Sequence, residues 1–155
     1  MPVSTRDGVD DSIRELLLHM PRMVGRAKRL PVPERVRSLE LSPRHLSLLA
    51  LLLFDGPATV NDLAARLEVA PTTVSLMVGE LSRKHVLERR EDDADRRRRI
   101  VSITAEMRPE IQDWLAGSAA AWRTALAPLT PAERRTFVDT LLTYERALDD
   151  QGATG

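Results

Sequence analysis

The chain has 155 residues, no cysteine, and 23 basic residues that balance 23 acidic ones. The absence of cysteine excludes disulfides, cysteine-based zinc sites and thiol chemistry, including thiol-based redox sensing. Because there is no apolar signal core at the N-terminus and no run near the ~20 apolar residues of a membrane span, we expect a cytoplasmic protein without a membrane partner.

The first predicted helix covers residues 12–30, where apolar side chains recur at helical spacing. Pro21 lies inside this segment and predicts either a kink or a split into two pieces. The following stretch LPVPERV holds two prolines in three residues, which predicts a break in the helical structure.

A central helix is predicted to start at Ser42-Pro43. Ser42 is a favourable N-cap, and proline is well tolerated at the first helical position because its missing N–H would have no partner there. The helix that follows, RHLSLLALLLF, is apolar on most sides, so we expect it to be central in the fold. The turn residues Asp55-Gly56-Pro57 predict its end.

Two short helices are predicted next. Thr59 is a candidate N-cap with an acid, Asp62, three residues later, and Pro71 begins the second helix. The predicted buried residues are Leu63, Ala64 and Leu67 in the first helix, and Val74, Met77, Val78 and Leu81 in the second. The residues then left facing outward are Thr72, Thr73, Ser75, Leu76 and Gly79. Two short helices joined by a tight turn predict a helix-turn-helix.

Two alternating, β-branched segments follow, at residues 86–90 and 99–104, and predict a two-stranded hairpin. Its tip, REDDADRRRR, places the acids ahead of an unbroken run of four arginines. A hairpin that directly follows a helix-turn-helix is a wing.

The remaining chain is predicted to be helical, and Thr130-Pro131-Ala132-Glu133 forms a capping box at the start of the last helix. Apolar stripes here contain Trp114, Trp122, Phe137 and Leu141. A lobe of this size cannot cover them all, which favours an oligomer interface. The alternative is that these helices fold back on their own lobe.

The segments LSPRHLSLLALL, TVNDLAARL followed by PTTVS, and DDADRR ahead of a strand that ends in Ser-Ile-Thr resemble, in this order and spacing, the core of the MarR family of bacterial transcription regulators. The resemblance covers residues 41–104. It implies a mainly α (α+β) fold in which residues 41–104 form the winged helix-turn-helix lobe. Residues 11–40 and 105–150 would form the N- and C-terminal dimerisation helices. The implied function is that of a transcription regulator that binds a pseudo-palindromic operator in double-stranded DNA as a homodimer. We expect it to repress transcription.

The resemblance assigns DNA reading to the start of the second short helix, at Pro71, Thr72, Thr73 and Ser75. Hydroxyls can bond to base edges and threonine methyls can pack on thymine, although small hydroxyl residues are also good helix starters. The chain departs from the family pattern at several positions. Leu76 stands where the family commonly has an arginine, and Ala70 takes the place of the usual serine cap. His85 and Met107 each stand where a glycine is usual. A neutral helix of this kind predicts weak base reading, with more of the binding left to the wing and to phosphate contacts.

In the wing, the family pattern D-x-R matches Asp95 and Arg97, so the resemblance implies that Asp95 braces the turn and Arg97 enters the minor groove. Arg96, Arg98 and Arg99 are then candidate phosphate contacts. Further phosphate candidates are Arg83 and Lys84, which we prefer to Ser42 and Arg44 because they lie next to the wing. The alternative is a plain charged hairpin tip.

Members of the family often respond to a small aromatic or phenolic anion, and the candidate contacts for such an effector are His19, Arg22, His45 and Trp114. Each of these residues also has an ordinary structural explanation. Three scattered histidines lack metal-ligand spacing, so we expect no metal, and we expect no cofactor. The chain lacks a phosphate loop, a nucleophile elbow and an HExxH motif, so we expect no enzyme. The alternative function is a winged-helix module for protein–protein interaction.

Overall fold

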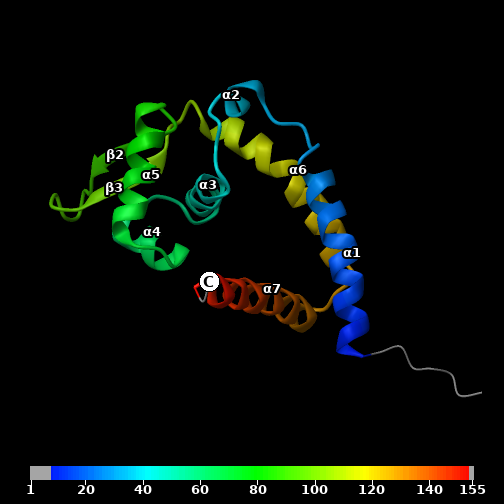
Figure 1. Ribbon diagram of the computed structural model, residues 1–155. Coiled ribbons are helices and arrows are strands. Elements are labelled where there is room, and N and C mark those ends of the chain that lie inside the picture. The colour runs from blue at the N-terminus through cyan, green and yellow to red at the C-terminus, as the bar shows by residue number, and fades with distance from the viewer. Residues whose placement is uncertain (1–7, 154–155) are drawn as a thin grey trace, which may run out of the picture. The chain divides into compact units, whose positions relative to one another are not determined.

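The structure, a computed structural model, describes residues 8–153 (Figure 1). The chain divides into two compact units between Ser118 and Ala119. The larger unit contains α1 to α5, the three strands and the first part of α6, while the smaller unit contains the end of α6 and α7. Within the described residues, no helix combines the length and the apolar character needed to cross a membrane.

The N-terminal helix α1 (Val9–Ala27) continues through Pro21 as one element, so the predicted split does not occur. The predicted break is confirmed, because residues 31–33 have no regular structure and only a short helix, α2 (Glu34–Arg37), follows them. Val36 of α2 is buried. The short turn of α2 therefore anchors this linker to the lobe.

The central helix α3 (Pro43–Asp55) starts at Ser42 as predicted. The Ser42 hydroxyl accepts a hydrogen bond from the His45 backbone N–H, and the Ser42 N–H donates to His45 Nδ1 at 3.2 Å. Histidine thus takes the place of the glutamate that usually completes a capping box. The helix ends at Gly56, whose φ of 87° and ψ of −174° suit glycine and almost no other residue.

The helix-turn-helix consists of α4 (Val60–Leu67) and α5 (Pro71–Arg83). Thr59 caps α4 by accepting a hydrogen bond from the Asp62 N–H at 3.1 Å. Ala70 occupies the N-cap of α5 and has no side chain that could cap it. The predicted core positions of both helices are buried, except that Leu67 is half-buried.

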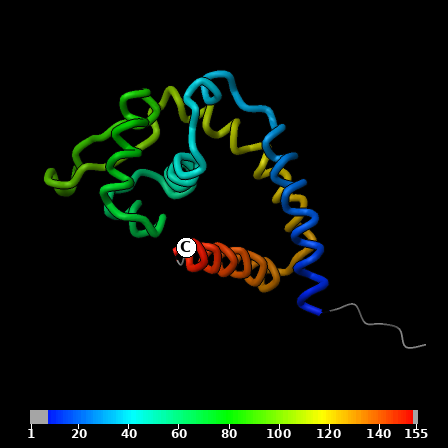
Figure 2. The backbone as a smooth tube through the Cα atoms, in the orientation of Figure 1, coloured from blue at the N-terminus to red at the C-terminus, as the bar shows by residue number. Residues whose placement is uncertain are grey.

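The predicted wing is confirmed as the hairpin of β2 (Leu87–Glu91) and β3 (Arg99–Ile103), with Leu87 opposite Ile103 and Glu91 opposite Arg99. A third strand, β1 (Ala58–Thr59), was not predicted and pairs antiparallel with β3. The strand order is β1-β3-β2, so β3 is the middle strand. β1 therefore joins the turn before α4 to the middle of β3, at Ile100 and Val101. The hairpin projects from the lobe beyond α5 (Figure 2).

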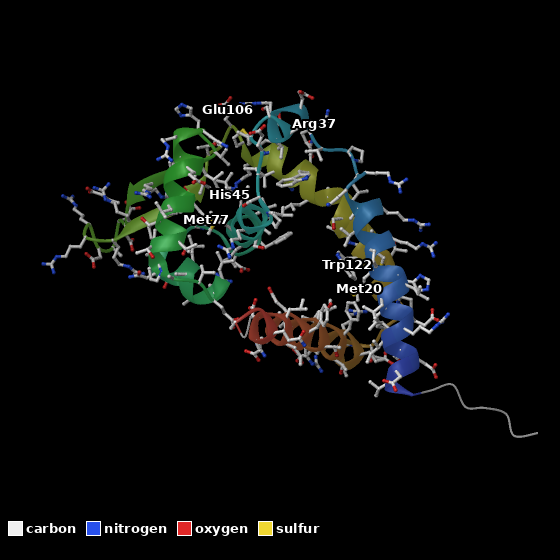
Figure 3. All side chains as sticks on the ribbon, viewed as in Figure 1. Met20, Arg37, His45, Met77, Glu106 and Trp122 are labelled. Carbon is white, nitrogen blue, oxygen red and sulfur yellow. The ribbon has the colours of Figure 1, made fainter. Side chains whose placement is uncertain are left out.

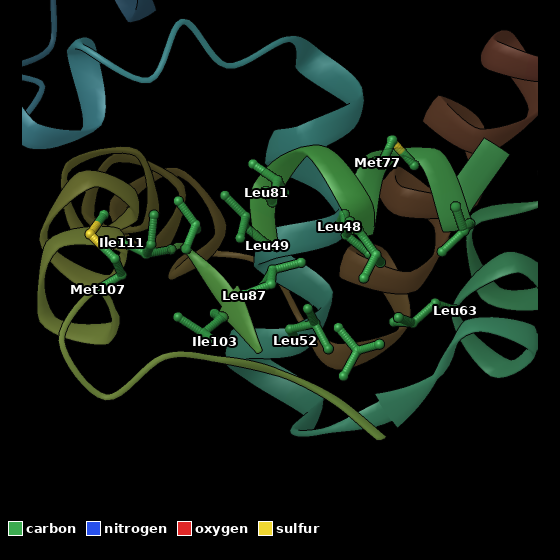
Figure 4. Packing of buried hydrophobic residues seen from close by; sticks show 14 of the residues in the cluster. Leu48, Leu49, Leu52, Leu63, Met77, Leu81, Leu87, Ile103, Met107 and Ile111 are labelled. Carbon is green, nitrogen blue, oxygen red and sulfur yellow. The ribbon is translucent and has the colours of Figure 1, made fainter. Parts of the chain in front are cut away.

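The hydrophobic core lies between α3, α5 and the sheet and is closed by the start of α6 (Arg108–Leu126), as Figure 4 shows. It extends beyond residues 41–104, because Val36, Met107 and Ile111 are buried in it. Trp114 is half-buried and packs against the same cluster. Trp114 therefore contributes to the lobe and does not belong to a free apolar stripe.

The smaller unit is built on α7 (Pro131–Gly152), whose predicted capping box is confirmed: Thr130 N–H donates to Glu133 Oε2 at 2.7 Å, and Glu133 N–H donates back to the Thr130 hydroxyl. The rings of Trp122 and Phe137 lie 5.7 Å apart. Trp122 and Leu141 nevertheless keep more than two fifths of their surface exposed.

Candidate nucleic-acid interface

The outward face of α5 combines small polar side chains with one large apolar side chain. Thr72, Leu76, Gly79 and Arg83 follow each other at spacings of four, three and four residues, which places them on one side of the helix. Thr72 and Ser75 are exposed as predicted, and Leu76 is 70% exposed. Thr73 is half-buried and thus less accessible than the sequence pattern predicts.

Arg83, a predicted phosphate contact, adds a cation to this face. A Cβ atom built on Gly79 would lie 3.7 Å from Arg83 Nη1, so the guanidinium extends back over the glycine toward the start of the helix. Long side chains on helices generally lean in this direction. The guanidinium has no hydrogen-bond or ion-pair partner within residues 8–153. Arg83 is therefore available for an anion.

Lys84, the other predicted phosphate contact next to the wing, has an internal partner. It lies at the C-cap of α5, and its Nζ donates to the Leu39 carbonyl oxygen at 2.6 Å. This bond ties the end of α5 to the segment before α3 and uses one of the three N–H donors of the ammonium group. Of the less favoured pair, Ser42 is used as a helix cap, and Arg44 is exposed.

Two aspartates shape the wing turn through the main chain. Asp92 Oδ1 accepts from the Ala94 N–H and Asp95 Oδ1 accepts from the Arg97 N–H, both at 3.0 Å. Main-chain bonds from Asp92 N–H to the Arg98 carbonyl and from Arg98 N–H to the Asp95 carbonyl close the turn. Asp95 thus braces the turn through the backbone N–H of Arg97, and among the described residues it makes no ion pair with the Arg97 guanidinium.

The four wing arginines fall into two groups. The Arg98 guanidinium lies 3.6 Å from Asp62 of α4 and 4.0 Å from Asp92, so this residue links the wing to the helix-turn-helix. The guanidinium groups of Arg96, Arg97 and Arg99 are exposed and have no partner in the part of the chain that the structure describes. Side chains that end in nitrogen project from the hairpin tip (Figure 3). Three free cations therefore remain at the tip, while Arg98 has a structural role.

The wing and α5 are also joined directly. Arg89 of β2 donates from Nη2 to the carbonyl oxygen of Ser75 at 3.4 Å. Ser75 is on the exposed side of α5, so this bond fixes the strand next to the candidate reading face. The two elements can therefore approach one ligand together.

The predicted effector contacts each have their own surroundings in the structure. His45, labelled in Figure 3, is held by Ser42 and by Glu80 of α5, whose Oε2 lies 3.1 Å from His45 Nε2. The His45 side chain is 12% exposed. Since His45 Nδ1 accepts from Ser42, Nε2 is the nitrogen that donates to Glu80. This tertiary pair was missed by the sequence reasoning, and it engages the one acidic residue of α5.

The other three effector candidates have separate surroundings. His19 pairs with Glu15 of its own helix at 3.1 Å, Arg22 is exposed, and Trp114 packs on the lobe core. No hydrogen bond or ion pair joins any two of the four candidates among residues 8–153. A shallow hollow along α7 is lined by other residues, which are Thr136, Asp139, Thr140, Thr143, Tyr144 and Ala147.

Comparison with known proteins identifies similar chains. The model of the MarR family matches residues 39–98. The HTH-type transcriptional repressor MdtR of Bacillus subtilis (strain 168) is 35% identical over 104 residues, which are 65% of this chain and 67% of that protein.

Two solved structures are similar to most of the chain. The YusO protein of Bacillus subtilis is 26% identical with a TM-score of 0.55, over 90% of this chain and 99% of that one. A mutant of S. aureus MepR bound to an oligodeoxyribonucleotide is 21% identical with a TM-score of 0.52, over 85% of this chain and 97% of that one. The second match shows a shared fold.

Proposed function

The chain belongs to the MarR family of transcriptional regulators, which are not enzymes, and we propose that it is a cytoplasmic repressor that binds a pseudo-palindromic operator as a homodimer. The observation that carries this proposal is the outward face of α5 beside a braced wing tip, where three exposed arginines have no partner among the described residues. The oligodeoxyribonucleotide bound to the S. aureus MepR mutant supports it as well, because this chain shares that fold.

The proposed interface divides the contacts by chemistry. A helix of 13 residues is about 20 Å long, and the small side chains at the start of α5 let it enter the major groove closely. Thr72 and Ser75 offer hydroxyls that donate to or accept from base edges. Their discrimination is modest, so positioning depends on cations that contact the phosphate backbone.

The wing supplies these cations. Between Arg89 and Arg99 the chain has six arginines and four acids, and two of the acids are turned toward main-chain N–H groups. A narrow minor groove concentrates negative potential and attracts an inserted arginine. We assign this role to Arg97, whose backbone is held by Asp95, and assign phosphate contacts to Arg96 and Arg83. Arg98 is assigned to holding the wing on α4.

The homodimer is proposed from exposed apolar side chains on helices outside the lobe. On α1 these are Val9, Ile13, Leu16, Leu17, Leu18, Met23 and Val24, and on α7 they are Val138, Leu141, Leu142, Tyr144 and Leu148. Contiguous apolar surface of this kind usually marks an interface. Light scattering coupled to size exclusion should give twice the chain mass, and a monomeric mass would contradict the proposed assembly.

The test of function begins with selection of duplexes from a random pool, followed by fluorescence anisotropy on the enriched sequence. Two variants with the same loss of charge should differ. Arg97→Ala should weaken binding by about tenfold or more, since an inserted arginine is lost from each subunit. Arg98→Ala should weaken binding less and should instead loosen the wing, because Asp62 and Asp92 lose their partner. Equal affinities for wild type and Arg97→Ala would contradict the wing assignment, and a pool with no enriched sequence would contradict the function.

Release by a small aromatic or phenolic anion stays a prediction, with His19, Arg22, His45 and Trp114 as its candidate contacts. Benzoate and salicylate can be titrated against the protein–operator complex. Release of DNA at millimolar ligand, diminished in Arg22→Ala, would support the prediction. Unchanged binding across the titration would count against this class of effector.

A further inference from the structure

Leu76 has a large apolar side chain that is not packed in the hydrophobic core. It is 70% exposed, whereas the other apolar residues of α5, namely Val74, Met77, Val78 and Leu81, are at most 7% exposed. An isolated exposed leucine needs no explanation on an ordinary surface. Here, however, it stands in the middle of the face that carries Thr72, Ser75 and Arg83.

The chemistry of leucine limits what it can recognise. Its side chain has no donor or acceptor, so it can make no hydrogen bond to a base edge or a phosphate. In the major groove the one apolar group that a base edge presents is the 5-methyl group of thymine. An exposed leucine on a helix in that groove therefore favours thymine, and it leaves the polar edges of the other bases without a partner.

The neighbours of Leu76 allow this contact. Gly79 follows three residues later on the same face and has no side chain of its own, so only the flexible Arg83 side chain lies over the helix beside Leu76. Thr72 lies one turn earlier and adds a second methyl group. The Arg83 guanidinium lies over Gly79 and supplies a positive charge next to Leu76, which makes the surface suitable for a polyanion and unsuitable as a purely apolar docking patch.

We propose that Leu76 is a specificity-determining residue that reads thymine by packing on its 5-methyl group, with Thr72 beside it. The proposal rests on the proposed DNA binding. It predicts that the operator has thymine at the positions that face the middle of α5. The occupant of this face is the major groove of DNA, and the preference comes from burial of methyl groups.

The test removes the methyl group from the DNA and the leucine from the protein. Each thymine of the selected operator is replaced in turn by deoxyuridine, which lacks only the 5-methyl group, and affinity is measured by anisotropy. Wild type should bind about fourfold more weakly for a fully buried methyl, as expected from the transfer free energy of one such group. Leu76→Ala should bind the thymine and uracil duplexes equally at that position. The ratio of the two effects is a double-mutant cycle, so a uniform change in affinity cancels.

Two further variants sharpen the test. Leu76→Gln keeps the length of the side chain but loses its apolar end, and it should lose the thymine preference as Leu76→Ala does. Phe54→Ala is the matched control, because Phe54 is also 70% exposed in the lobe but lies on α3. This control should keep the fourfold preference. Circular dichroism verifies that each variant is folded.

The outcomes separate the two proposals. If wild type enriches no sequence, the DNA-binding function itself fails. If wild type binds an enriched operator but is indifferent to deoxyuridine at every position, the reading of thymine methyls is wrong. It is also wrong if Leu76→Ala keeps the full preference for thymine.

Discussion

Replacing Gly79 by alanine should stabilise the lobe, whereas the same replacement at Gly56 should destabilise it. Space does not distinguish the two sites. A Cβ on Gly79 would meet only Arg83 Nη1, at 3.7 Å, which is an ordinary contact, and a Cβ on Gly56 would meet nothing within 4 Å. The opposite outcomes therefore come from the backbone alone.

The magnitudes follow from the dihedral angles. Gly79 lies inside α5 without a positive φ, and a glycine in a helix interior is about 1 kcal/mol less favourable than alanine. Gly79→Ala should therefore raise the free energy of unfolding by about 1 kcal/mol, which corresponds to an increase of about 2–4 °C in Tm. Gly56 has a φ of 87° with ψ near 180°, a conformation that costs a residue with a side chain about 1–3 kcal/mol. Gly56→Ala should therefore lower the free energy of unfolding by about 1–3 kcal/mol.

Urea denaturation followed by far-ultraviolet circular dichroism measures both changes, at one fixed protein concentration because oligomers unfold in a concentration-dependent way. The denaturant slope should be unchanged, so that the midpoints report stability. A loss of stability in Gly79→Ala would refute the regular backbone and the open contact assigned to α5. A neutral Gly56→Ala would refute the positive φ at the end of α3.

Three other changes test local features of the structure. The Ser82 hydroxyl is buried without a hydrogen-bond partner among the described residues, so Ser82→Ala should gain about 1 kcal/mol in urea denaturation, and a loss would mean that the hydroxyl is bonded. His85 has a φ of 58°, and His85→Gly should gain about 0.5 kcal/mol, because the left-handed penalty exceeds the entropy cost of glycine; a destabilised variant would contradict this. The N–H and hydroxyl of Thr130 hold the pKa of Glu133 below its ordinary value of 4.5. The capping box should thus stabilise α7 above that pH and lose its contribution as the pH falls through the lowered pKa of the folded state. Thr130→Ala should cost about 1 kcal/mol near neutral pH and should flatten the acid limb of the stability profile, and an unchanged limb would argue against the box.

Local signals were sufficient to predict most elements from the sequence. A capping oxygen stands at the start of three helices, on Ser42, Thr59 and Thr130. At the end of α3, Gly56 adopts a backbone conformation with a positive φ that glycine tolerates. These interactions span three residues or fewer, so they are present in the sequence pattern itself. The hairpin was predictable because its strands alternate on either side of a polar turn.

Contacts between distant segments could not be predicted in the same way. β1 has two residues, too few for any periodicity, and it exists only because β3 lies beside it. The pairs His45–Glu80 and Lys84–Leu39 join residues 35 and 45 positions apart. They change the interpretation of two candidate site residues, since each is engaged inside the lobe.

The wing shows the same limit in the candidate site. The sequence singled out Arg97 by its spacing from Asp95 but treated Arg98 like Arg96 and Arg99, and only the fold reveals that Arg98 lies near Asp62 of α4 while the other three have no partner among the described residues. The continuation of α1 through Pro21 also escaped the sequence rules, because they left open both a kink and a split.

The salt dependence of operator binding tests the proposed interface most directly. Two wings that each present Arg96, Arg97 and Arg99, with the guanidinium of Arg83 on each α5, give eight cationic groups, and each contributes a slope of about −0.9 in log affinity against log salt. Wild type should therefore show a linear decrease with a slope of about −7, and Arg97→Ala should be shallower by about 2, because one group is lost from each subunit. A slope near zero, or one unchanged in Arg97→Ala, would contradict DNA binding through the wing and would favour docking to a protein partner.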